Sequence, residues 1–338
     1  MSDGNGKPGF NPDGSVSVPA FSLPVSGLLS EEAQAMQRAR ADMPLFDAAG
    51  FDTPIAERRE QVNAYAYMAM PRLREQFPVT IERTAIAGVN VLDVRPEAGV
   101  RDESRVLINL HGGAFIVGWD GIALMESIPM AVLSGLRIVS VDYRMAPEHR
   151  HPAGVEDVAA VYAALLEEYA PANIGIFGGS AGGALTAQAA AWLPAHGLPQ
   201  AGAVAILGAG AVPFDSGESA YTAGYIDGSF PPPPVDGSVG HDMTRGYFDD
   251  CDPKDASAWP GYHLNVLAQF PPTLILTGTR ALDLSPAIYT NSQMLKAGQK
   301  PILIVGEGMG HCFHYQLNLP EGRDACAAIV AFFEENLG

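Results

Sequence analysis

The chain has 338 residues, of which 47% are hydrophobic and 17% charged, so it has enough apolar side chains for a large core. Its 38 acidic residues outnumber 20 basic ones, and the formal net charge of −18 would repel nucleic-acid phosphates and anionic membrane surfaces. These values argue against a nucleic-acid partner and indicate a globular protein with one main sheet-centred domain.

The cysteines and the amino terminus predict a cellular location. Cys251, Cys312 and Cys326 form no C-x-x-C pair, and such an odd, sparse set argues against a disulfide framework and favours a reducing compartment. The first ten residues, MSDGNGKPGF, have no basic start followed by an apolar stretch, so neither a signal peptide nor a membrane span is expected. We therefore expect a cytoplasmic protein.

Residues 1–60 are predicted to form an N-terminal cap segment. Residues 1–26 are rich in Gly, Pro, Ser and Asn, and a helical pattern then runs from Ser30 toward Met43. A second helix is predicted from Pro54 to about Phe77. Because no run in this segment has the composition of a buried strand, we expect it to act as a lid.

Residues 61–338 are predicted to form the catalytic domain, an α/β fold with an eight-stranded, mostly parallel, doubly wound sheet. The later strand candidates are continuously apolar, as expected for strands that helices cover on both faces. An insert at about residues 213–269 lacks periodicity and contains PPPP, which is typical of a lid. The eight strand candidates are VTIERT, VNVLDVRP, RVLINLHGG, RIVSVDY, NIGIFGG, AVAILG, PTLILTG and PILIVGEG.

The pentapeptide GGSAG at residues 178–182 has the pattern G-x-S-x-G and lies between a predicted strand and a predicted helix. A serine on such a sharp turn needs small neighbours, because large side chains would collide with the adjacent strand and helix. We predict that Ser180 is a nucleophile and that the amide of Ala181 stabilises negative charge on a reacting oxygen. A simple glycine-rich turn is the alternative for these five residues alone.

A second motif, HGGAF at residues 111–115, follows the predicted strand VLINL. The amides of Gly112 and Gly113, and that of Ala114, can approach a substrate oxygen because no bulky side chain stands in the way. Gly112, Gly113 and Ala181 are therefore predicted to form an oxyanion hole. An ordinary tight turn is the alternative for this motif alone.

A third motif, GMGHCF at residues 308–313, follows the last predicted strand. His311 is predicted to be the base that activates Ser180, because a loop at this position can reach over the nucleophile. His314 is the neighbouring competitor.

These motifs resemble those of the hormone-sensitive-lipase-like group (bacterial family IV) of the α/β-hydrolase superfamily, which carries H-G-G-G/A-F, G-D/G/T-S-A-G and a late G-x-x-H-G-F. The run DYRMAPEH at residues 142–149 is similar to the group's D-Y-R-L-A-P-E-H segment. The resemblance covers residue 79 to the C-terminus and implies an α/β-hydrolase fold and a serine esterase. For Asp142, Arg144 and Glu148 we expect a structural role, with charged side chains pairing near a strand end.

The sequence departs from the family pattern at the acid. The family's aspartate comes four residues after the first Thr of T-G-T-R, where this chain has Ala281, and Asp283 follows two residues later. Residues two apart in an extended segment point the same way, so a modest shift of the loop would bring Asp283 to His311. Asp283 is predicted to be the acid. The alternatives are a solvated turn residue and Glu307 as a substitute acid.

The predicted residues fit a hydrolase that needs neither a metal nor another cofactor. Ser180 would attack an ester carbonyl as His311 takes its proton, Asp283 would orient the imidazole, and water would hydrolyse the acyl-enzyme. The resemblance implies short-chain carboxylic esters as substrates. A lactone, thioester or amide substrate is an alternative, and a non-catalytic ligand-binding protein on the same scaffold is another that the presence of His311 disfavours.

The cap segment and the insert are expected to shape the acyl and alcohol pockets. The resemblance also suggests a homodimer formed through the last strand, and PILIV fits an edge strand. Side chains available to line the pockets are Phe21, Leu23, Phe214, Tyr221 and Tyr225.

Overall fold

The computed structural model describes residues 6–42, 53–228, 230–235, 238 and 240–338. Its main sheet has eight strands in the order β10–β9–β8–β7–β5–β6–β4–β3. Strand β4 pairs antiparallel with both neighbours, and the other neighbouring strands are parallel. The predicted α/β fold and mostly parallel sheet are therefore confirmed. The strands are β3 (Val79–Ile86), β4 (Val89–Pro96), β5 (Val106–Leu110), β6 (Arg137–Val141), β7 (Ile174–Gly179), β8 (Ala203–Leu207), β9 (Thr273–Gly278) and β10 (Ile302–Gly306).

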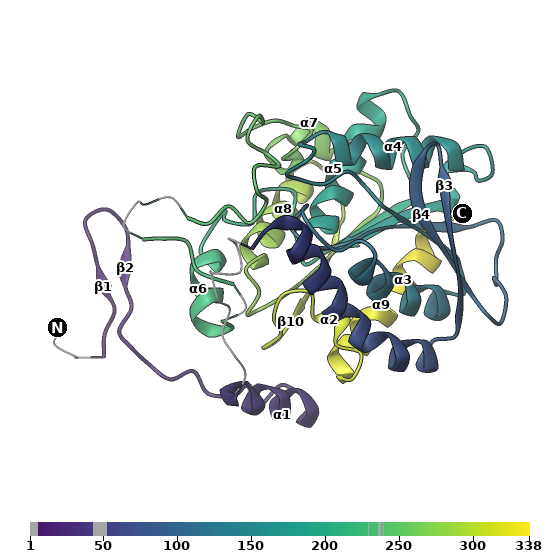
Figure 1. Ribbon diagram of the computed structural model, residues 1–338. Helices are drawn as coiled ribbons and strands as arrows, with labels where there is room; N and C mark the ends of the chain where they lie inside the picture. Colours follow the sequence, from purple (N-terminus) through teal and green to yellow (C-terminus); the bar gives the residue numbers. More distant parts are fainter. Residues whose placement is uncertain (1–5, 43–52, 229, 236–237, 239) are drawn as a thin grey trace.

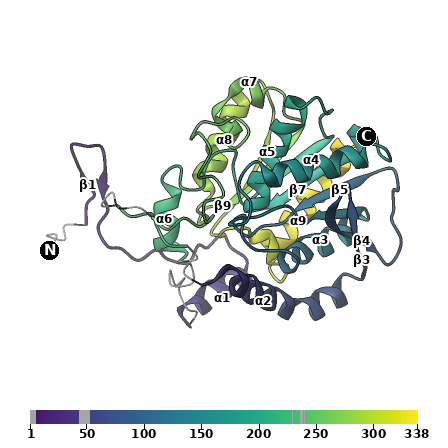
Figure 2. The ribbon, with the colours of Figure 1, turned by 45° about the horizontal axis from the view of Figure 1, so that its top comes forward.

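Helices cover both faces of this sheet (Figures 1 and 2). α3 and α9 pack on one face, with α1 and α2 outside them, whereas α4, α5 and α8 cover the other face. The helices are α1 (Glu31–Ala39), α2 (Ile55–Gln76), α3 (Gly121–Ser134), α4 (Ala153–Leu165), α5 (Ala181–Ala195), α6 (Ser219–Ile226), α7 (Leu264–Leu267), α8 (Leu284–Lys296) and α9 (Pro320–Asn336). Short 3-10 helices are η1 (Arg40–Asp42), η3 (Pro171–Asn173), η4 (Pro260–Tyr262) and η5 (Phe313–Tyr315).

Strand β5 shows why the central runs are continuously apolar. Val106, Ile108 and Leu110 pack in the core on the α4 and α5 side, and Leu107 packs in the core on the α3 and α9 side. Successive side chains of a strand point to opposite faces, so a strand covered by helices on both faces is apolar at every position. The single polar side chain of β5 is the buried Asn109, which faces a carboxylate of α3.

The last strand is an edge strand, as PILIV predicted. β10 pairs only with β9 in the described sheet, and Ile302 and Val305 are 44% and 40% exposed. Unpaired backbone groups and apolar side chains on an open edge are features through which a second chain can pair. The homodimer through this strand stays a prediction.

The N-terminal segment lies outside the sheet. β1 (Gly9–Phe10) and β2 (Val16–Ser17) form a small antiparallel hairpin at one side of the molecule (Figure 1). Helix α1 begins after Ser30, whose Oγ accepts a hydrogen bond from the amide of Ala33 at 3.1 Å and donates to Glu321 of α9 at 2.9 Å. The end predicted near Met43 lies outside the described residues. The second predicted helix is confirmed as α2, which begins after Pro54.

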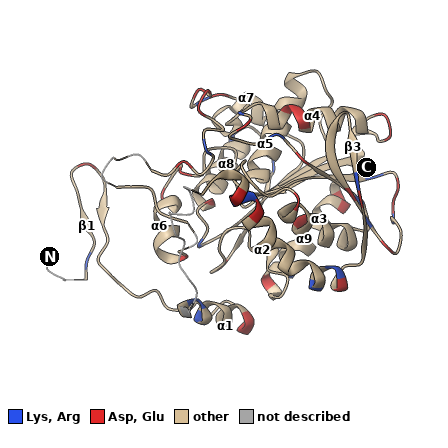
Figure 3. Cartoon of the chain, viewed as in Figure 1, with Lys and Arg blue, Asp and Glu red and all other residues tan. Residues whose placement is uncertain are grey.

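Acidic residues are distributed over helices and loops around the molecule, as Figure 3 shows. The excess of 38 acidic over 20 basic residues is therefore not gathered in one segment. Among the described residues, no helix has both the length and the apolar composition that crossing a bilayer requires.

Replacing Gly182 by Ala is expected to destabilise the fold strongly. A Cβ atom at this position would overlap the backbone carbonyl of Leu110, which belongs to a strand and has no room to move. We expect a loss of about 3 kcal/mol, seen as a fall in Tm of roughly 4 °C in thermal unfolding of a chain of 338 residues. Gly27→Ala is the matched control, because a Cβ there meets no atom within 4 Å. A Gly182→Ala protein that melted with the wild type would contradict this packing.

Candidate active site

Ser180 lies on the sharp turn between β7 and α5. Its backbone has φ 57° and ψ −121°, a conformation that a residue with a side chain rarely adopts. Two glycines make the turn possible, because a Cβ on Gly178 or on Gly182 would overlap the carbonyl oxygen of Leu110. The amide of Ser180 donates to the carbonyl of Leu207 on β8 at 2.8 Å. The strand–turn–helix context that the G-x-S-x-G motif predicted is present.

Three segments bring Ser180, His311 and Asp283 together. Nε2 of His311 lies 2.9 Å from Oγ of Ser180, and its Nδ1 lies 2.5 Å from Oδ1 of Asp283. The other carboxylate oxygen of Asp283 accepts a hydrogen bond from Oγ1 of Thr277 at 2.6 Å. Asp283 is 0% exposed, so the surrounding protein holds its carboxylate in one orientation.

Asp283 reaches His311 from a turn, and not from the extended segment that was predicted. The chain turns after β9, with the amide of Ala281 donating to Gly278 and that of Leu284 donating to Ala281. Asp283 directly precedes α8, which begins at Leu284. The expectation of an extended segment is wrong, because this turn carries Asp283 inward. The substitute acid Glu307 is exposed.

The environments of the two neighbouring histidines differ. Burial by itself lowers the pKa of His311, but interactions with Cys312 and with the carboxylate of Asp283 outweigh burial and raise this pKa well above the ordinary 6.5. Burial lowers the pKa of His314 to about 3. Neither ring nitrogen of His314 has a hydrogen-bond partner among the described residues. His314 is therefore a neutral, buried side chain, whereas His311 is placed to accept a proton.

The amides near Ser180 correct one part of the predicted oxyanion hole. The amide of Gly112 donates to Oε1 of Glu126 at 3.0 Å, so the prediction for Gly112 is wrong because a buried carboxylate already takes this hydrogen. In the part of the chain that the structure describes, the amides of Gly113, Ala114 and Ala181 donate to no other group. These three amides are available to a bound oxygen.

The turn after β5 depends on a glycine at position 113. Gly113 has φ 121°, and a Cβ there would overlap the carbonyl oxygen of Val117. Ala114 and Phe115 follow with φ 55° and 61°. Turns of this kind can bring successive N–H groups into an anion-binding concavity.

Aromatic rings flank His311 on the insert side. Phe214, which was predicted to line the pocket, has its ring centroid 6.2 Å from that of His311, and Phe230 lies closer at 5.2 Å. Phe230 was not among the predicted lining residues, although it is the only aromatic residue in the Pro- and Gly-rich run 227–240. The other predicted lining side chains are exposed, between 41% and 76%: Phe21, Leu23, Tyr221 and Tyr225.

The N-terminal segment also contacts the chain around His311. Nε2 of Gln37 on α1 donates to the carbonyl of Gly308 at 2.8 Å. Arg40 binds Asp227, which follows α6 of the insert. The segment 6–42 and the insert therefore meet beside the loop that carries His311.

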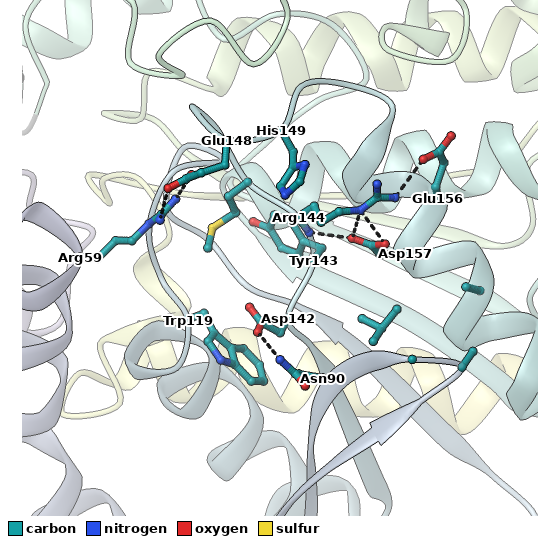
Figure 4. Close-up of a pocket in the computed structure, with 15 residues that line it drawn as sticks. Arg59, Asn90, Trp119, Asp142, Tyr143, Arg144, Glu148, His149, Glu156 and Asp157 are labelled. Carbon is teal, nitrogen blue, oxygen red and sulfur yellow. Dashed lines mark hydrogen bonds and ion pairs between the residues drawn. The ribbon is translucent and has the colours of Figure 1, made fainter. Parts of the chain in front are cut away.

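A separate hollow of about 900 Å³ lies between α2, α4, the β3–β4 turn and the chain after β6 (Figure 4). None of Ser180, His311 and Asp283 lines it. The charged side chains drawn in Figure 4 pair with other elements: Arg59 of α2 with Glu148, and Arg144 with Glu156 and Asp157 of α4, while Asp142 accepts a hydrogen bond from Asn90. These contacts fit the structural role expected for Arg144 and Glu148.

Comparisons with known proteins agree with this geometry. Residues 107–315 match a family model described as the alpha/beta hydrolase fold. An acetyl-hydrolase of Streptomyces hygroscopicus is 30% identical over 247 residues, which cover 72% of this chain and 79% of that protein. The crystal structure of an esterase called E25 superposes with a TM-score of 0.81 at 28% identity, covering 96% of this chain and 99% of that one.

A further solved structure indicates which group of α/β-hydrolases the chain resembles. A crystal structure described as an esterase from the bacterial hormone-sensitive lipase family superposes with a TM-score of 0.74 at 27% identity and covers 91% of this chain and 98% of that one. The family match spans more than half of the 338 residues and includes both the turn after β5 and His311. The chain therefore belongs to the α/β-hydrolase superfamily, in its hormone-sensitive-lipase-like group of esterases.

Proposed function

We propose that this protein is a carboxylesterase that cleaves short-chain carboxylic esters through an acyl-enzyme on Ser180. The observation that carries the proposal is the hydrogen-bonded series Ser180, His311 and Asp283 beside three amides that have no other acceptor in the described chain. Carboxylic ester hydrolysis is the activity named for its relatives, an acetyl-hydrolase and esterases among them.

In the proposed reaction, Oγ of Ser180 attacks the ester carbonyl as Nε2 of His311 takes its proton. The carboxylate of Asp283 holds the imidazole through Nδ1 and stabilises the imidazolium that forms. His311 then gives the proton to the leaving alcohol. Water repeats the sequence on the acyl-enzyme and releases the acid.

Negative charge on the carbonyl oxygen would be stabilised by the amides of Gly113, Ala114 and Ala181. One such donor is worth about 2.7–4 kcal/mol of transition-state stabilisation, because it is already oriented and shielded from water. The strained turn at Ser180 supports this role, since it directly precedes the free amide at the start of α5. The proposed oxyanion hole thus replaces Gly112 with Ala114.

We propose that residues 1–60 and the insert at 213–269 cap the site and limit the size of the substrate. Support comes from the contacts of Gln37 with Gly308 and of Arg40 with Asp227, and from the rings of Phe214 and Phe230 beside His311. A site flanked by aromatic rings favours small acyl or alcohol groups over long chains. Parts of both segments lie outside the described residues.

A series of p-nitrophenyl esters from acetate to palmitate tests the activity and its chain length. We expect the wild type to prefer short esters and Ser180→Ala to lose at least about 10⁴-fold in kcat, because no other group can form the acyl-enzyme. Ser134→Ala is the matched control, since this buried serine lies at the far end of α3. An inert wild type, or an active Ser180→Ala, would overturn the function, and faster hydrolysis of long-chain emulsions would overturn the chain length.

Replacing each of the two candidate acids by its amide tests the role of Asp283. Asp283→Asn should lower kcat by about 10³–10⁴-fold, because an amide cannot hold His311 in the tautomer that accepts a proton from Ser180. Glu307→Gln should change kcat by less than about twofold, because its side chain is exposed while Asp283 holds Nδ1 of His311. Steady-state kinetics on p-nitrophenyl acetate measures both. The reverse ranking would identify Glu307 as the acid.

The pH dependence of kcat/KM should report the raised pKa of His311. Only the neutral imidazole accepts a proton, so activity should rise with pH through this pKa, and the midpoint should lie above pH 6.5. Asp283→Asn should move the midpoint to lower pH, because it removes a negative charge that favours the imidazolium. Profiles measured with an ester that has no titratable group give the midpoint directly. A wild-type midpoint at or below pH 6.5 would contradict the proposed environment.

A further inference from the structure

Glu126 is a buried carboxylate directly below the proposed active site. It lies on α3, among the apolar residues of GIALMESIPM, and is 5% exposed. Its Oε1 accepts the amide hydrogen of Gly112 at 3.0 Å, and its Oε2 accepts a hydrogen from Nδ2 of Asn109 at 2.7 Å. The hydroxyl of Tyr315 also donates to Oε1.

The pair Glu126–Tyr315 lies against the turn after β5, the turn that carries Ser180 and the loop that carries His311. A Cβ on Gly179, next to Ser180, would overlap the Tyr315 hydroxyl and lie 3.2 Å from Oε1 of Glu126. A Cβ on Gly112 would lie 3.3 Å from the same hydroxyl. Tyr315 itself comes four residues after His311. The proposed oxyanion turn (residues 111–115), the proposed nucleophile turn (178–182) and the histidine loop (308–315) therefore meet at one carboxylate.

No cation balances this carboxylate in the part of the chain that the structure describes, where no Lys or Arg forms an ion pair with it. Burial raises the pKa of Glu126 to about 7, and hydrogen bonds from Tyr315, Asn109, Gly112 and Gly179 oppose that rise. His314 beside it stays neutral. Titratable groups that face Glu126 or interact with its charge from the neighbouring elements are Tyr143, Cys312, His314, Tyr315 and Cys326.

Resting on the proposed esterase function, we propose that Glu126 is a positioning residue whose carboxyl group aligns the oxyanion turn with the nucleophile turn. Tyr315 acts through it and ties the His311 loop to the same point. Neither side chain touches the substrate. Their effect is on where the reacting groups lie.

The hydrogen bonds explain why a carboxylate is needed here. Glu126 accepts hydrogen bonds from the Gly112 amide, the Asn109 side chain and the Tyr315 hydroxyl, and a carboxylate can accept all three without donating in return. Binding the Gly112 amide fixes the peptide that precedes the amides of Gly113 and Ala114. A donor displaced from the developing oxyanion loses much of its effect, since a misplacement of about 1 Å can cost about 10²-fold in rate.

Glu126→Gln tests this role, because glutamine keeps the size of the side chain but turns one acceptor into a donor that faces other donors. We expect kcat on p-nitrophenyl acetate to fall about 10- to 100-fold with KM changed less than about threefold. The inhibition constant of a trifluoromethyl ketone, whose adduct with Ser180 carries an oxyanion, should rise by the same factor. Tyr315→Phe should lower kcat by about three- to tenfold, and the double variant should be no worse than Glu126→Gln alone.

Asp93→Asn is the control for a purely structural effect. Asp93 is a buried carboxylate that binds Arg95 and Arg137 at the far part of the sheet, so its loss should lower Tm and leave kcat and the inhibition constant unchanged. A folded Glu126→Gln protein with wild-type kcat and inhibition constant would overturn the proposal. If Glu126→Gln does not fold, the kcat and the inhibition constant of Tyr315→Phe test the proposal, and wild-type values of both would overturn it. A wild type inert on every ester would instead remove the proposed function itself.

Discussion

The close packing of helix α5 against strand β5 is the constraint on which the site depends. The carbonyl of Leu110 fills the space that a side chain at Gly178 or Gly182 would need, so the chain turns from β7 into α5 without room for a Cβ at either position. Ser180, between them, takes a strained left-handed conformation that projects it beyond the sheet. The residue after Leu110 begins the turn that carries Gly113 and Ala114. One packing contact thus sets the separation of Ser180 from the amides of Gly113 and Ala114.

Sheet order then decides which loops reach Ser180. β7, β9 and β10 run parallel, so the segments that follow them lie together at the carboxyl ends of the strands. These segments carry Ser180, Asp283 and His311. β8 lies between β7 and β9, and Gly208 after it passes below Cys312, where a Cβ would lie too close to its sulfur. Burial at this end of the sheet excludes water and strengthens the hydrogen bonds that hold the imidazole of His311.

Two buried carboxylates near the site differ in the charge of the groups that they face. Asp283 faces an imidazole that can become a cation, whereas Glu126 faces only neutral donors, and burial raises its pKa to about 7. Burying a charge without a cation lowers stability, and proteins retain such groups chiefly where function uses them. The salt-bridged Arg144 and Glu148 of the DYRMAPEH segment instead pair across elements near the surface.

The sequence by itself determined the strands, the turn that carries Ser180 and the position of His311, because each depends on neighbours within a few residues: apolar runs, small residues around Ser180, and a loop after the last strand. The family resemblance, with a shift of two residues, pointed to Asp283, but the turn that carries Asp283 inward emerged only in the folded chain. Tertiary structure alone decided that Gly112 donates to Glu126, that Phe230 lies beside His311, and that Tyr315 reaches the nucleophile turn. These contacts join residues from separate segments, and local pattern carries no information about which side chains meet once the sheet and its helices have packed.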